Sequence, residues 1–273
     1  MRALFGSIVL TTLLASCLGG CWFGYNGRKD FYLCEELTNL NLQIPLRVAG
    51  INIIKSNLSK ITADAFMQYA ETLIELNITG CGLELIEPDA FKGLNKLQLL
   101  NLSNNKIHKI EALSFTGMPN LRSLYLYRNR ISEIDPEFYD LMPNLEILDV
   151  AHNDMTVCMY PKYLMKLKSL REIYIGENPW SYRCRTMMTS YLQSQRIRYI
   201  RTWAVFSDSL IDDCLAHEPE VDKDEAMLKK CVERKTNAAL PYDLLTFTEK
   251  FRELSNKLTQ LEADVTLLKK SAP

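Results

Sequence analysis

Histidine is scarce in this chain, with only 3 among 273 residues. The sequence also lacks an H-E-x-x-H motif, a G-x-S-x-G motif, a phosphate-binding glycine loop and any cluster of residues at metal-ligand spacing. Those patterns place the bases, nucleophiles and metal ligands on which many enzymes depend. We therefore expect a protein that is not an enzyme and that has no catalytic residue, no metal site and no cofactor.

An excess of charge of one sign is also missing, because 32 Lys and Arg stand against 33 Asp and Glu. We therefore expect no nucleic-acid partner.

Long apolar runs are confined to the N-terminus, where Arg2 precedes the apolar run Ala3–Leu14 and small residues follow. This pattern predicts a signal peptide over residues 1–20, with an apolar run too short for a membrane span. Leu14–Cys17 also fits a bacterial lipobox, which would anchor Cys17 in a membrane.

A secretory signal implies a soluble, extracellular protein with no membrane span. Sequons for N-glycosylation fit that location, since the modification occurs in the secretory pathway. The predicted glycosylation sites are Asn57, Asn77 and Asn101.

One motif recurs along the chain and is clearest at Leu97–Phe115, which reads LQLLNLSNNKIHKIEALSF. It follows the pattern L-x-x-L-x-L-x-x-N-x-L of a leucine-rich repeat. Copies begin 24 or 25 residues apart, at Val48, Leu73, Leu97, Leu121, Leu145 and Leu170. The period predicts an α/β solenoid, a leucine-rich repeat horseshoe of about six repeats with disulfide caps.

Positions counted from the first residue of each repeat separate interior from surface. Side chains alternate along a strand, so positions 4 and 6 are predicted to face the core and positions 3, 5 and 7 the concave face. Position 9 is usually Asn, which can satisfy backbone groups inside the turn, and Cys81 is expected to be a buried thiol at this position. The aromatic column at position 19 is expected to belong to the core; its members are Phe66, Phe91, Phe115, Tyr139 and Tyr163.

The concave face is where solenoids usually bind. Glycans at Asn77 and Asn101, at position 5 of adjacent repeats, would obstruct its N-terminal half. The candidate binding residues therefore lie on the other half, and they are Tyr125, Tyr127, Arg128, Asp149, His152 and Tyr174. Tyr and Arg are enriched in binding hot spots. The alternative is an ordinary hydrated strand face.

Cysteines flank the repeats. A bridge between Cys21 and Cys34 would close an N-terminal cap. Cys158 and Cys184 occupy corresponding places in neighbouring coils, which predicts a second bridge, and a competing scheme pairs Cys184 with Cys214. Cys214 and Cys231 then form a third pair, or one of them links to another chain.

After Pro241 the apolar period changes to alternating steps of 3 and 4 residues. This is the seam of a coiled coil, formed by Leu244, Phe247, Phe251, Leu254, Leu258, Leu261, Val265 and Leu268. The alternative is a helix that packs on its own chain. The predicted organisation is a signal peptide (1–20), an N-terminal cap (21–47), repeats (48–180), a C-terminal cap (181–217) with short helices over Thr186–Trp203, and a helical tail (218–273).

A secretion signal, few repeats, this cysteine set and a terminal coiled coil, in that order, resemble the leucine-rich immune molecules of mosquitoes, specifically the short-repeat subclass. The resemblance implies a haemolymph protein of insect innate immunity. It also implies a homo- or heterodimer formed through the coiled coil, in some members disulfide-linked, here through Cys231 or Cys214. Some members hold a complement-like thioester protein, so the resemblance implies that such a protein is a candidate partner here. Alternative functions are a soluble receptor for microbial glycan or lipid and an extracellular matrix or growth-factor-binding protein.

Overall fold

The computed structural model describes residues 20–24, 27–200, 213–218, 220–221 and 224–239. Residues 1–19 of the predicted signal peptide lie outside the described ranges, as does the predicted seam from Leu244 to Leu268. The chain divides into two compact units, Met1–Ala204 and Val205–Pro273, which are described separately. Within the described part of the chain, no helix combines the length and the apolar character needed to cross a membrane.

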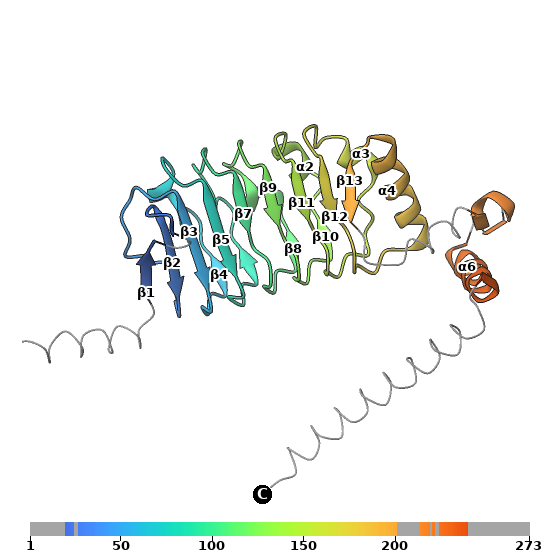
Figure 1. Cartoon of the computed structure of the whole chain (residues 1–273), viewed down its shortest axis with the longest axis horizontal. Helices are drawn as coiled ribbons and strands as arrows, with labels where there is room; N and C mark the ends of the chain where they lie inside the picture. Colours follow the sequence, from blue (N-terminus) through green and yellow to red (C-terminus); the bar gives the residue numbers. More distant parts are fainter. Residues whose placement is uncertain (1–19, 25–26, 201–212, 219, 222–223, 240–273) are drawn as a thin grey trace, which may run out of the picture. The chain divides into compact units, whose positions relative to one another are not determined.

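The first unit is built on one sheet, in which the strands follow one another from β1 to β13 (Figure 1). In sheet order these strands are β1 (Gly20–Phe23), β2 (Phe31–Glu35), β3 (Gly50–Ile54), β5 (Glu75–Thr79), β7 (Leu99–Asn101), β9 (Ser123–Tyr125), β11 (Ile147–Asp149), β12 (Glu172–Tyr174) and β13 (Arg198–Ile200). β1 pairs with β2 in antiparallel fashion, and every later pair is parallel.

The return segments contain short elements of their own. Two parallel pairs join β4 (Lys60–Ile61) to β6 (Leu85–Ile86) and β8 (Lys109–Ile110) to β10 (Glu133–Ile134). Short helical turns complete the coils, namely η2 (Met67–Tyr69), η3 (Ala112–Phe115), α2 (Phe138–Leu141) and α3 (Pro161–Leu164).

The register of the sheet matches the repeat position by position. Leu100 lies opposite Leu76 on one side and Leu124 on the other, so position 4 forms one continuous row. Leu124 and Leu126, at positions 4 and 6, are both fully buried, while Tyr125 between them is partly exposed. The predicted solenoid with a parallel sheet is therefore confirmed.

Asparagines at position 9 form a hydrogen-bonded ladder through the interior. The Asn129 Nδ2 donates to the carbonyl oxygens of Leu102 and Leu126, each at 3.0 Å, and its Oδ1 accepts from the Ile107 N–H at 3.1 Å. Asn153 makes the equivalent bonds one coil further on. The ladder satisfies backbone groups that the turns leave unpaired, as the sequence predicted. Cys81 takes this position in the second repeat as a buried free thiol.

Aromatic rings form a second column beneath the return segments. Phe91 stacks between Phe66 and Phe115, with ring centroids 6.4 Å and 5.7 Å apart. Phe138 continues the column against Phe115 at 5.4 Å, although the repeat pattern placed Tyr139 there. Position 19 therefore belongs to the core from Phe66 to Tyr139, whereas Tyr163 is only partly buried against it.

Each end of the sheet is closed by a disulfide. Cys21 is bonded to Cys34 beside the first strands, and Cys158 is bonded to Cys184 in the helix α4 (Tyr182–Ser194). Ser181 is the N-cap of helix α4, and its Oγ accepts from the Cys184 N–H at 3.1 Å. The expectation of helices throughout Thr186–Trp203 is wrong in part, because α4 starts earlier and β13 extends the sheet by pairing with β12.

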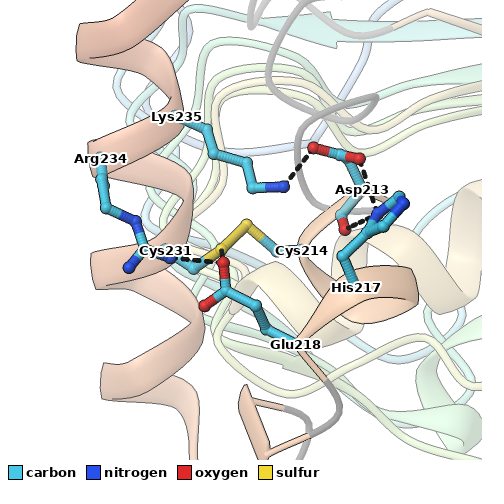
Figure 2. A network of polar contacts seen from close by, with 7 residues as sticks. All are labelled: Asp213, Cys214, His217, Glu218, Cys231, Arg234 and Lys235. Carbon is cyan, nitrogen blue, oxygen red and sulfur yellow. Dashed lines mark hydrogen bonds and ion pairs between the residues drawn. A yellow bond between two sulfur atoms is a disulfide. The ribbon is translucent and has the colours of Figure 1, made fainter.

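The described part of the second unit is a helical turn at residues 213–217 and the helix α6 (Glu225–Ala239). Cys214 and Cys231 join them covalently. Figure 2 shows the surrounding polar contacts, in which Lys235 contacts Asp213 and Arg234 contacts Glu218. This intrachain bridge excludes the alternative Cys184–Cys214 pair and leaves neither Cys214 nor Cys231 free for a link to another chain.

Candidate functional site

One row of side chains crosses the whole concave face at position 5. The lateral pairing places Asn77 beside Asn101, Asn101 beside Tyr125, and Asp149 between Tyr125 and Tyr174. The row is therefore made of amides in its N-terminal half and of rings and a carboxylate in its C-terminal half. Three of the predicted binding residues thus lie side by side on adjacent strands.

A hollow opens on the C-terminal half because the side chains at position 7 become small. Tyr127 stands at this position in the fourth repeat, but Ala151 and Gly176 follow in the fifth and sixth. The missing side-chain volume leaves an open hollow of about 420 Å³. Its lining consists of Tyr127, Asp149, Ala151, His152, Tyr174, Gly176 and Ile200.

Arg128 and His152 occupy position 8, where the strand has ended and the backbone turns. Both have a φ of 55°, in the left-handed region, and each backbone N–H donates to a carbonyl oxygen of the next repeat. The His152 and Tyr127 rings form a T-shaped pair with centroids 4.9 Å apart. The Arg128 guanidinium lies 5.9 Å from the Tyr127 centroid and does not line the hollow.

Asp149 is the acidic group of the hollow. Its Oδ1 accepts from the Ala151 N–H at 3.0 Å. Burial raises the pKa of this carboxyl above its ordinary value, while the Ala151 N–H and the nearby His152 oppose that shift. The folded chain therefore favours the protonated form of Asp149 more than water does.

Tyr174 forms the far wall of the hollow next to an acidic strand neighbour. Its hydrogen bond with Glu172, together with burial, raises the pKa of the phenol. Glu172 in turn lies 3.5 Å from the Arg198 guanidinium on β13. Tyr174 is therefore a neutral ring wall at neutral pH.

The structure brings four of the six predicted residues into one hollow, namely Tyr127, Asp149, His152 and Tyr174. Tyr125 lies next to Asp149 in the row, and the Arg128 guanidinium lies over the Tyr127 ring. The hollow also contains three residues that the sequence analysis did not name. Ala151 and Gly176 could have been found as small residues at the position of Tyr127, whereas Ile200 stands on the unexpected strand β13.

The predicted glycosylation sites lie away from the hollow. Asn57 is exposed after β3, and Asn77 and Asn101 are partly buried neighbours on the concave face. The Asn101 Oδ1 accepts from the Ser103 N–H at 3.0 Å. Attachment of glycans at these asparagines stays a prediction.

The chemistry available in the hollow is that of binding. Asp149 ends β11 and His152 lies in the turn that follows it, but no Ser, Thr or Cys is among the described residues that line the hollow. No group of three or more His, Cys, Asp or Glu within the described ranges could hold a metal ion. Rings, a carboxylate and two small residues instead form a surface that can receive a side chain.

Comparison with known proteins agrees with this geometry. Residues 71–131 and 119–179 match the family model described as Leucine rich repeat. No curated protein matches the chain.

Among solved structures, a chain in the crystal structure of a TLR13–ssRNA13 complex is 24% identical with a TM-score of 0.53. The match covers 59% of this chain and 23% of the other, so this chain spans about a quarter of that protein's length. At this identity the likeness concerns the fold, and a fold alone does not select a ligand. The match to the leucine-rich repeat model therefore covers the central part of the chain, residues 71–179, and the solved structure shares its fold.

Proposed function

We propose that the chain is a secreted, non-enzymatic scaffold of insect innate immunity that binds another protein on the C-terminal half of its concave face. The observation that carries the proposal is the hollow formed by Tyr127, Asp149 and Tyr174, because tyrosines at the centre of a surface are typical anchors of protein interfaces. Three disulfide bridges within the described residues fit an extracellular location, since such bridges persist in oxidising compartments.

The resemblance to mosquito leucine-rich immune molecules suggests which protein is bound. We propose a complement-like thioester protein as the partner and the C-terminal seam from Leu244 to Leu268 as the element through which two chains associate. Because Cys214 and Cys231 are bonded to each other, this association is proposed to be non-covalent.

The test is capture of partners from haemolymph, or from the medium of a secreting insect cell line, with the tagged full-length chain. Bound proteins are identified by mass spectrometry, and the chain is run on gels with and without reductant. We expect a thioester protein in the bound fraction and no reductant-sensitive dimer. Recovery of the chain alone would contradict the proposal, and retention of a microbial glycan or lipid in place of a protein would favour a receptor for microbial surfaces.

Two variants separate the face from the tail. Replacement of Tyr125, Tyr127 and Tyr174 by Ala removes the rings from partly exposed positions, and truncation at Pro241 removes the seam. We expect the triple variant to lose partner capture and the truncated chain to lose self-association. Capture that survives the triple substitution but fails after truncation would assign the interaction to the tail.

A further inference from the structure

We infer that the hollow receives an organic cation, the side chain of a lysine or arginine on the bound protein, between the rings of Tyr127 and Tyr174 and against the Asp149 carboxylate. This inference rests on the proposed function, because it names what the partner presents to the same face. It specifies that the partner side chain received by the hollow is a cation.

The charge balance of the hollow is the first argument. Asp149 is the carboxylate among the described lining residues, and none of those residues is Lys or Arg. The carboxylate accepts a bond from the Ala151 N–H, and the lining residue that acts on it electrostatically is His152; no Lys or Arg of the described residues forms an ion pair with it. A partly buried carboxylate without a cation is unfavourable. A lysine or arginine from outside would supply the missing charge.

The rings give the second argument. A cation is attracted to the face of an aromatic ring within about 6 Å of its centroid, and more strongly when water is displaced. Tyr127 already attracts a cation within the chain, since the Arg128 guanidinium lies 5.9 Å from its centroid. Arg128 does not line the hollow. Tyr127 itself lines the hollow, so a cation from a partner seated there would lie close to the same ring.

The size of the hollow can accommodate a long side chain. Ala151 and Gly176 stand at the repeat position that Tyr127 holds in the fourth repeat, so open space of about 420 Å³ remains among residues that include Tyr174. Lysine and arginine can place apolar methylenes in such a space and direct the charge to a carboxylate. A phosphate or another anion would instead meet the negative charge of Asp149.

The test uses the full secreted chain and small probes whose binding is followed by saturation-transfer NMR. The probes are the Nα-acetyl amides of lysine, arginine and norleucine, and norleucine resembles lysine without its charge. We expect lysine and arginine to bind and norleucine to show no saturation transfer. Asp149→Asn should weaken binding of both cationic probes about tenfold or more, the scale of a charge-assisted hydrogen bond.

The matched control is Asp154→Asn, which removes one carboxylate from an exposed position outside the hollow. It should leave binding of the lysine probe unchanged. Equal binding of norleucine and lysine, or equal losses in the two Asp variants, would overturn the inference. Spermidine and choline are further arms, and binding of either without binding of the lysine and arginine probes would assign the hollow to free amines and refute a protein side chain as its occupant.

The inference and the proposed function fail in different ways. If the chain captures its protein partner but neither cationic probe binds, the inference is wrong and the scaffold function stands. If the probes bind in an Asp149-dependent way but no protein is captured, the cation site stands and the scaffold function is wrong.

Discussion

The two halves of the concave face share a backbone and a core but present different chemistry. In the N-terminal half the central row contains Asn77 and Asn101, both within sequons, and in the C-terminal half it contains Tyr125, Asp149 and Tyr174. The buried aliphatic side chains beneath both halves form one row, from Leu76 through Leu124 to Ile173. The comparison shows that the repeat determines where a side chain points, while departures from the repeat determine what the surface can bind.

The largest expected effect comes from the core that both halves share. Phe91→Ala removes a fully buried ring between Phe66 and Phe115. We expect it to lower the free energy of unfolding by about 3–5 kcal/mol, because a cavity remains in a packed column. Urea unfolding followed by circular dichroism measures this. Leu113→Ala, at a side chain that is 64% exposed, is the control, and losses of equal size in the two variants would show that the column is not a stabilising core.

The next effect separates the two ends of the solenoid. Replacing both Cys158 and Cys184 by Ser opens a bridge between residues 26 apart, and replacing Cys21 and Cys34 opens one between residues 13 apart. Loss of either disulfide should lower the free energy of unfolding by about 3 kcal/mol, slightly more for the longer loop. Thermal unfolding measures the difference.

The two double variants should differ in binding. The Cys158–Cys184 bridge holds α4, which is followed by β13 and therefore by Ile200 of the hollow. We expect its loss to weaken binding of the lysine probe and the loss of Cys21–Cys34 to leave that binding unchanged. The reverse result would mean that the N-terminal cap, not the C-terminal one, supports the hollow.

A smaller effect concerns how much the ionised Asp149 carboxylate lowers the free energy of unfolding. Because burial raises the pKa of Asp149, the folded chain binds this proton more tightly than the unfolded chain does. Ionised Asp149 therefore destabilises the fold; the penalty is absent at a pH below its unfolded pKa and complete above its folded pKa. Asp149→Asn should keep the bond from the Ala151 N–H and should not lower stability at pH 7.

The expected gain at pH 7 is at most about 0.5 kcal/mol, the usual range outside the core. It should vanish as the pH falls into the acid range where the wild-type carboxyl is protonated. Unfolding of the wild type and the variant in urea at several pH values measures the difference. A variant that is less stable at pH 7 would show that the carboxylate has a structural role and is not retained for binding.

Much of this fold follows from the sequence because the repeat is periodic. A leucine at position 4 and an asparagine at position 9 have the same neighbours in each coil, so Leu124 and Asn129 could be placed without the structure. β13 could not, because Arg198–Ile200 carries no repeat motif and becomes a strand only by pairing with β12. The sequence named Tyr127 and Tyr174 as candidates on the concave face because rings are conspicuous there, but it did not predict a hollow. The floor of the hollow is made by the small size of Ala151 and Gly176, which no binding motif marks.

The smallest expected effect tests whether the two halves are independent. Thr79→Ala and Ser103→Ala each remove a sequon but keep Asn77 and Asn101, and the Ser103 backbone N–H can still donate to Asn101. Each variant should lose the mass of one glycan, while binding of the lysine probe changes by less than about twofold, because Asn77 and Asn101 do not line the hollow. Mass spectrometry and the NMR titration measure the two results. Weaker binding after loss of a glycan would mean that the N-terminal half takes part in the site. Unchanged binding would confine recognition of the lysine probe to the C-terminal half, where the row contains rings and a carboxylate in place of amides.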